Sequence, residues 1–242
     1  MELSGRTALV TGGAHRVGRA LTLALARDGA DVAIHYRNSD AEAEQTAREV
    51  EALGRKAVII QADLADATAA DSVVDSAVEG LGRLDVLVNS ASLFESASLL
   101  DVNVQAWDRV MAVNLRAPFL LTQAAAPHLA VDGGVIINIA DLAGLQAWPA
   151  FPHHGVSKAG LIHLTRISAR SLGPEVRVNC VVPGTVLPPE DYTDEQVAAS
   201  VERTVLKRVG SPQDVEEAML FLILSDFATG SVVVVDGGRM LR

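Results

Sequence analysis

Seven short apolar runs recur along the chain, and segments of helical length separate them. The runs read TALVT (7–11), DVAIHY (31–36), KAVIIQ (56–61), LDVLVN (84–89), GVIINI (134–139), VRVNCVV (176–182) and SVVVVD (231–236). Nearly continuous apolar character is typical of strands that are covered on both faces. Helical spacing is found from Val17 to a stop at Gly29 and over 41–53, 66–80, 104–129, 154–172 and 212–225. The alternation predicts one α/β domain over residues 1–242, a doubly wound parallel sheet of about seven strands with helices on both faces.

Composition narrows the classes of partner. The chain has 242 residues, of which 49% are hydrophobic, so it can bury a large core. Its formal charge of −10 argues against nucleic acid or an anionic membrane surface as the main partner. Cys180 is the only cysteine, so we expect no internal disulfide and a reducing compartment. Without a membrane-length apolar stretch or a signal-peptide pattern, the sequence predicts a soluble, cytoplasmic protein with no metal site and no membrane partner.

A glycine-rich turn directly follows the first predicted strand. The segment TGGAHRVGRA (11–20) has Gly12 and Gly18 in positions that suit a tight turn and close helix packing. The helix that begins there would direct its amino end at a pyrophosphate. Arg16 stands where a further glycine would be usual. Because ligands of such sheets bind beyond the carboxyl ends of the strands, the context favours a dinucleotide site.

The end of the second strand indicates which dinucleotide is bound. An acidic residue there would hold a ribose 2′-hydroxyl and repel a 2′-phosphate, but this chain has Tyr36, Arg37, Asn38 and Ser39. Arg37 suits a phosphate, and the two residues after it add hydrogen-bonding groups. The alternative is a solvated arginine at the entry to a helix. We predict NADPH as the cofactor.

Further cofactor contacts are expected after the third and fourth strands. Asp63 and Leu64 end the third, where Asp63 suits an adenine amino group, although a loop aspartate is more often a helix cap. Asn89, Ser90 and Ala91 end the fourth, where small residues let the backbone approach the cofactor. The remaining residues that we expect to contact the cofactor are His15, Val17, Lys158, Pro183, Gly184 and Val186.

Taken together, these motifs resemble the short-chain dehydrogenase/reductase superfamily, whose fold is Rossmann-type. The resemblance spans nearly the whole chain and includes Asn114 in VMAVNLRAPF, Lys158 in HGVSKAGL, and VVPGTV followed by VDGG. A finer similarity is to its pteridine reductase branch, including bacterial dihydromonapterin reductases. That similarity rests on Arg16, on HYRNS at the second strand, on Phe94 in SASLF, on Asp141 in NIADLAG where most of the superfamily has serine, and on the ending VDGGRMLR.

The resemblance implies roles for several side chains. Lys158 would bond the nicotinamide ribose and lower the pKa of a neighbouring proton donor. Asn114 would hold a water in a proton path. Ser92 and Phe94 would contact a planar substrate, with Phe94 stacked on a pterin-like ring, whereas the plain alternative is a core phenylalanine. Residues 187–208 would form a substrate lid, for which a plain surface loop is the alternative, and the family usually forms homotetramers.

Asp141 is the predicted centre of proton delivery. An aspartate there can donate a proton to a ring nitrogen, directly or through water. Beside the apolar residues Ile136, Ile139 and Leu142 it would be buried and have a raised pKa, as a general acid near neutral pH requires. The alternative is an exposed turn aspartate.

His154 stands four residues before Lys158, where the superfamily has its proton-donating tyrosine. The spacing puts both side chains on one helix face. Imidazole titrates near pH 6.5, but Lys158 would disfavour its charged form and the ring is shorter than tyrosine, so direct donation calls for a water or a shifted substrate. Because Asp141 is present, reduction of a dihydropterin to a tetrahydropterin remains open to this chain.

Three hypotheses follow. The leading one is an NADPH-dependent reductase of dihydropterin- or dihydrofolate-type substrates that uses Asp141 for protonation. The second is a carbonyl or imine reductase with His154 as the acid. The third is a catalytically weakened NADP-binding protein.

Overall fold

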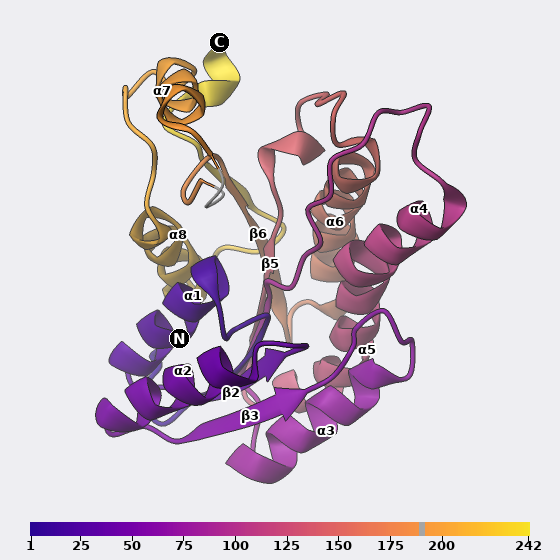
Figure 1. Ribbon diagram of the computed structural model, residues 1–242. Coiled ribbons are helices and arrows are strands. Elements are labelled where there is room, and N and C mark those ends of the chain that lie inside the picture. The colour runs from indigo at the N-terminus through magenta and orange to yellow at the C-terminus, as the bar shows by residue number, and fades with distance from the viewer. Residues whose placement is uncertain (189–191) are drawn as a thin grey trace.

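The computed structural model describes residues 1–188 and 192–242. They form one α/β domain around a parallel sheet in the order β3-β2-β1-β4-β5-β6-β7 (Figure 1). The strands are β1 (Thr7–Thr11), β2 (Asp31–Tyr36), β3 (Ala57–Gln61), β4 (Val86–Asn89), β5 (Val135–Ile139), β6 (Arg177–Pro183) and β7 (Val232–Val235). Each lies within the predicted run or within one residue of it, so the predicted fold class is confirmed.

The helices cover both faces of the sheet. They are α1 (Arg16–Arg27), α2 (Asp40–Ala52), α3 (Ala69–Leu81), α4 (Val104–Met111), α5 (Ala117–Leu129), α6 (Pro152–Leu172), α7 (Asp194–Glu202) and α8 (Pro212–Leu224). The first helix ends as predicted, because Gly29 adopts a φ of +98°. No helix in the described part of the chain is both long and apolar enough to cross a membrane.

Two expectations about elements need correction. The single helix expected over 104–129 is interrupted by a π-helical turn at Ala112–Arg116 between α4 and α5. The segment 187–208 is not a plain surface loop, which was the alternative to a lid, because α7 lies inside it. A capping box starts that helix: Thr193 accepts from the Gln196 backbone, and the Gln196 side chain accepts from the Thr193 backbone. Residues 189–191 of the predicted lid lie outside the described residues.

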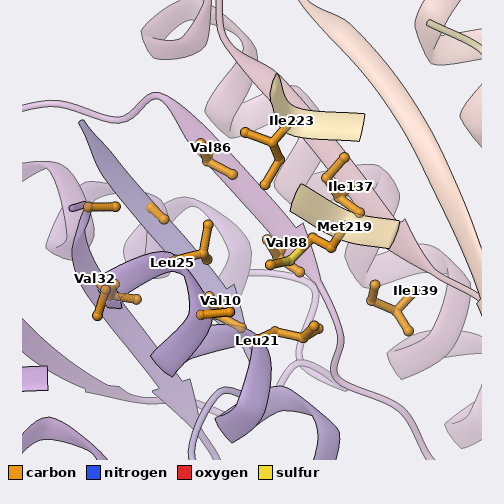
Figure 2. Packing of buried hydrophobic residues seen from close by; sticks show 14 of the residues in the cluster. Val10, Leu21, Leu25, Val32, Val86, Val88, Ile137, Ile139, Met219 and Ile223 are labelled. Carbon is orange, nitrogen blue, oxygen red and sulfur yellow. The ribbon is translucent and has the colours of Figure 1, made fainter. Parts of the chain in front are cut away.

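Alternating residues of each central strand belong to two hydrophobic cores, one on each face of the sheet. On one face, Val10 and Val88 pack with Leu21 of α1 and Met219 of α8 (Figure 2). On the other face, Leu9 and its neighbours on β4 and β5 pack against α3 and α5. Because successive strand residues point to opposite faces, a continuous apolar run can bury both sides of the sheet.

Strand order sets the place of the site. Strand β1 pairs with β2 on one side and with β4 on the other. The strands up to β3 are therefore added on one side of β1, and those from β4 onward on its other side. The loops after β1 and β4 therefore diverge to opposite faces and leave a crevice at the carboxyl edge. The ends of β5 and β6 lie next along the same edge.

Candidate active site

The turn after β1 is built around two glycines. Gly12 has a φ of +63°, which favours glycine, and a Cβ on Gly18 would lie 2.0 Å from the Gly12 carbonyl oxygen. Any side chain at Gly18 would therefore push the helix away from the turn. Arg16, where a further glycine would be usual, has a φ of +50°. The predicted tight turn and close helix packing are both present.

The side chain of His35 stabilises this turn through a hydrogen bond, a role that sequence reasoning missed. The Gly12 backbone N–H donates to Nδ1 of His35 over 3.2 Å, and Nε2 of His35 lies 3.1 Å from the Ala62 carbonyl oxygen. A carbonyl only accepts, so Nε2 carries the hydrogen and the ring is neutral. Burial lowers the pKa of His35 to about 4. The one available signal was a histidine inside the otherwise apolar run DVAIHY.

The ends of β2 and β3 remain open to a ligand. Arg37 and Ser39 are half-buried and Asn38 is exposed, while Tyr36 is buried and donates from its hydroxyl to Asp40 over 3.1 Å. Asp63 accepts from the Ala65 backbone N–H over 2.9 Å, which stabilises a local turn, and it does not cap α3, whose N-cap is Thr68.

The end of β4 is fixed to β1 by Thr11. Its hydroxyl oxygen accepts from the backbone N–H groups of Ser90 at 3.0 Å and Ala91 at 3.1 Å. Deeper in the sheet, Asn89 donates to the Asn138 side chain over 2.9 Å, and its own Oδ1 atom is buried without a partner among the described residues. A Cβ on Gly12 would lie 3.0 Å from Cα of Ala91, so the two turns approach closely.

Lys158 lies on α6 at the end of β5. It is buried, and its Nζ donates to the Ile139 carbonyl oxygen over 2.8 Å. Burial lowers the pKa of Lys158 to about 8, against the attraction of the nearby Asp141 carboxylate. Burial thus brings the pKa of this amine closer to physiological pH than that of an exposed lysine.

His154 lies one turn before Lys158 and is 2% exposed. Its Nδ1 lies 3.0 Å from the Leu93 carbonyl oxygen, so Nδ1 carries a hydrogen and donates it. Nε2 then faces Asp141, whose Oδ1 lies 3.8 Å away, and has no hydrogen-bond partner in the described chain. The predicted convergence of His154 and Lys158 on one site is present.

Asn114 occupies the π-helical turn and orders the loop after β4. Its Oδ1 accepts from the Leu93 N–H over 2.7 Å, and its Nδ2 donates to the Leu93 carbonyl at 2.9 Å and to Ser157 Oγ at 3.1 Å. These bonds fix the orientation of the amide. Its 3.4 Å contact with Nδ1 of His154 joins two donors and is not a hydrogen bond.

Asp141 is less buried than the sequence indicated. Its side chain is 25% exposed, and its Oδ1 accepts from the Ala143 backbone N–H over 2.7 Å at the start of a short 3₁₀ turn. The expectation of a buried carboxyl is wrong because the turn places Leu142 in the core and leaves Asp141 at the cavity surface. Oδ2 is the oxygen left for a ligand.

A cavity of about 560 Å³ joins these groups. Phe94 forms part of its wall, is 47% exposed and stacks on Phe151 with ring centroids 4.3 Å apart, so the core interpretation of Phe94 is wrong. Trp148 extends the same wall, with its ring centroid 6.3 Å from that of Phe151. A flat apolar ligand has a preformed surface here.

The cavity brings together part of the predicted set. Its lining includes Arg16, Val17, Ser90, Ser92, Phe94, Asp141, His154, Lys158, Pro183, Gly184 and Val186. Outside that lining lie Gly12, His15, Gly18, Tyr36, Arg37, Asn38, Ser39, Asp63, Leu64, Asn89, Ala91 and Asn114. Tyr192 and Arg203 of the lining fall within the predicted lid segment, whereas sequence reasoning missed the lining residues Trp148, Phe151, Thr185 and Arg239. Of these, the aromatic spacing in WPAF was the one visible signal.

Comparison with known proteins identifies the family. The sequence pattern of the family described as enoyl-(acyl carrier protein) reductase matches residues 12–239. The short-chain dehydrogenase/reductase FrzI of Cladobotryum sp is 39% identical over 98% of this chain and 96% of its own length. The chain belongs to the short-chain dehydrogenase/reductase superfamily.

Other members of the superfamily are equally similar over their whole length. L-rhamnose 1-dehydrogenase (NAD(P)(+)) of Sphingomonas sp. (strain SKA58) is 36% identical over 99% of this chain and 98% of its own. The crystal structure of FolM alternative dihydrofolate reductase 1 from Brucella canis, complexed with NADP, superposes with a TM-score of 0.94 at 32% identity, covering 100% of this chain and 96% of that one. Membership in this superfamily makes the cavity at the strand ends the candidate active site.

Proposed function

We propose that this protein is an NADPH-dependent reductase of dihydropterin- or dihydrofolate-type substrates. The observation that carries the proposal is the union, in one cavity, of an aromatic wall at Phe94 with an acid–base group formed by Asp141, His154 and Lys158. The NADP-bound dihydrofolate reductase relative adds support from outside the chain. The substrate is a small planar heterocycle.

The residues fit a nicotinamide dinucleotide phosphate. The turn after β1 lies tightly against the start of α1, since a Cβ at Gly18 would strike the Gly12 carbonyl oxygen, and at the end of β4 the buried Oδ1 of Asn89 has no partner among the described residues. Gly12, Arg16 and Gly18 would hold the pyrophosphate, Arg37 with Asn38 and Ser39 the 2′-phosphate, and Lys158 the nicotinamide ribose. When bound, the dinucleotide supplies the hydride.

Asp141 delivers the proton in this proposal. Reduction of a C=N bond adds a hydride to carbon and a proton to the adjacent nitrogen. Because Oδ1 is already an acceptor for Ala143, the transferable proton belongs on Oδ2. The exposed quarter of the side chain gives Asp141 a route to be reprotonated from water.

His154 positions Asp141. The distance of 3.8 Å between Nε2 and Oδ1 is too long for a hydrogen bond, so a bridging water that donates to both atoms would connect them. Because Nδ1–H is held by Leu93, Nε2 is the ring nitrogen that faces the carboxyl group. The Asp141 carboxylate attracts the positive charge of Lys158 and so opposes the lowering of the lysine pKa by burial.

A second candidate is a carbonyl or alcohol oxidoreductase in which His154 itself transfers the proton. The buried Nε2 without a described partner favours it, and so does the sugar dehydrogenase relative. A third candidate, an NADP-binding protein without turnover, has only the histidine at position 154 in its favour.

A substrate panel separates the candidates. Purified protein is mixed with NADPH and 7,8-dihydrobiopterin, 7,8-dihydrofolate or an aromatic ketone, and oxidation of NADPH is followed by absorbance. Separate assays give L-rhamnose and galactose with NADP⁺. Turnover of a dihydropterin that Asp141→Asn abolishes supports the proposal. Reaction with ketone or sugar alone contradicts it, and NADPH-induced thermal stabilisation with no turnover favours the third candidate.

A further inference from the structure

Two arginines that the proposed chemistry does not use, Arg203 and Arg239, line the same cavity. They come from segments far apart in sequence, the end of α7 and the C-terminal turn, which lie side by side (Figure 1). Hydrogen bonds join the two segments, because the Gly237 carbonyl accepts from the N–H groups of Val205 at 2.8 Å and Leu206 at 3.0 Å. The placement of the two cations is therefore built into the fold.

The C-terminal turn is held firmly in this position. Asp236 accepts from the Gly238 N–H with Oδ1 and from the Met240 N–H with Oδ2, each over 2.8 Å. A Cβ on Gly238 would lie 2.9 Å from Cβ of Val205, so the glycine allows the close approach. Both Asp236 oxygens thus serve the turn that presents Arg239, and neither bonds to its guanidinium.

Arg239 is oriented by two contacts inside the cavity. Its guanidinium carbon lies 4.6 Å from the centroid of the Trp148 ring, and its Nη1 donates to Thr185 Oγ1 over 2.8 Å. A guanidinium carries five N–H donors, so most of its hydrogen-bonding capacity is left for a ligand. Burial, and then the charge of Arg203, lower the pKa of Arg239. Arg203 is exposed and Arg239 is half-buried, and two like charges that line one cavity favour an anion between them.

The cavity lining is mostly positive, whereas the chain as a whole is negatively charged. The protein has a formal charge of −10, yet the described lining includes Arg16, Lys158, Arg203 and Arg239 against the carboxylate of Asp141. The proposed function uses Lys158 for the nicotinamide ribose and Arg16 for the pyrophosphate, and Nη2 of Arg16 already donates to the carbonyls of Leu187 and Pro188. The arginines at the C-terminal end are thus the cations that remain for the substrate.

We propose that Arg203 and Arg239 form an anion subsite that binds a carboxylate or phosphate carried by the substrate on the side away from its reacting ring. Trp148 and Phe151 connect this end of the cavity with Phe94, so one ligand can stack its ring and place its anionic group in the subsite. The substrate class becomes a planar heterocycle with an anionic substituent. The identity of the substrate's ring rests on the proposed function, whereas the binding test of the anion subsite does not depend on it.

Binding of matched ligand pairs tests the subsite by calorimetry on the NADPH-saturated protein. The first pair is 6-carboxypterin and 6-hydroxymethylpterin, which differ at one anionic group. The phosphate ester of 6-hydroxymethylpterin separates phosphate from carboxylate. Naphthalene-2-carboxylate and naphthalene-2-methanol form a pair without a pterin ring. Binding alone is measured, so an inactive protein is still informative.

We expect an anionic member to bind about tenfold or more tightly than its neutral partner, and the preference to weaken as salt is added. Arg203→Gln and Arg239→Gln should each reduce the preference to about threefold or less while leaving affinity for the neutral ligand unchanged. Arg242→Gln is the matched control, because Arg242 lies in the same turn, donates to the Glu202 carbonyl and is outside the cavity lining. It should keep the wild-type preference.

Each outcome decides between the two claims. If no pterin binds but the naphthalene pair shows the arginine-dependent preference, the proposed function fails and the subsite stands. If neither pair shows a preference for the anion, or if the preference survives both arginine variants, the subsite is overturned.

Discussion

Nε2 of His154 lies 3.8 Å from Oδ1 of Asp141, and the hydrogen bond from Nδ1 to the Leu93 carbonyl oxygen fixes the ring in that position. The Leu93 backbone is in turn held by Asn114 from the π-helical turn. Three segments thus determine which nitrogen of the imidazole faces the carboxyl group. Nε2 is therefore the ring nitrogen that lies on the Asp141 side of the cavity.

Asp141→Asn should lower kcat on a dihydropterin by about 100-fold or more, because it removes a general acid. His154→Gln should have a smaller effect, about tenfold or less, since it removes only a positioning contact. Steady-state kinetics with NADPH in excess measure both. A larger loss in the histidine variant would instead identify His154 as the acid.

We expect the His154→Tyr variant to gain carbonyl reductase activity while it keeps the same fold. A phenol at this position lies one helical turn from Lys158, whose charge favours the phenolate and eases proton transfer. We expect turnover of an aromatic ketone to rise by about tenfold or more over wild type. His154→Phe is the control for the effect of ring size. Equal ketone activity in the two variants would show that the hydroxyl does not act.

Stability should fall as pH decreases from about 6.5 to 4, in part because of His35. Burial lowers the pKa of folded His35 to about 4, below its value of 6.5 in the unfolded chain, so the unfolded chain takes up the proton first. The contribution is complete above pH 6.5 and is lost by pH 4, and it amounts to at most about 3 kcal/mol.

Urea denaturation of the wild type and of His35→Gln, measured across this range, checks the assignment. The variant should show a shallower pH dependence. His128→Gln, at the half-buried end of α5, should keep the wild-type slope. A slope that is unchanged in His35→Gln would contradict the assignment.

Lys158→Met should abolish turnover while preserving or raising thermal stability. A buried amine whose pKa is lowered to about 8 is held at a desolvation cost, and methionine fills similar space without that cost. The midpoint of thermal unfolding and kcat/KM measured on the same preparation separate the two effects. A variant that unfolds at lower temperature would mean that the bond to Ile139 stabilises the fold.

We predict that the protein assembles as a homotetramer through the face formed by α5 and α6. Phe119 is 42% exposed and Ile167 is 51% exposed, and both line an apolar groove beside α4. Ile167→Glu should shift the sedimentation of the protein to smaller species. Val131→Glu, exposed in the turn after α5, is the control. A wild-type protein that sediments as a monomer would overturn the prediction.

Local patterns in the sequence determined much of this protein. Apolar runs alternate with helical segments, and this period is set by residues within a few positions of one another, so the strands and most helices could be predicted. The Gly12 and Gly18 turn could also be predicted, because backbone sterics restrict those positions. Lys158 and His154 share a helix face by spacing alone.

Tertiary structure decided the environment of each group. The exposure of Asp141, the hydrogen bond between His35 and Gly12, and the approach of the segments that carry Arg203 and Arg239 depend on packing between segments that are distant in sequence. No local sequence pattern encodes these contacts, because the burial of a side chain and the charges near it depend on residues that only folding brings together. The sequence thus determined which chemical groups the protein carries to the edge of its sheet, and the fold decided which of them meet.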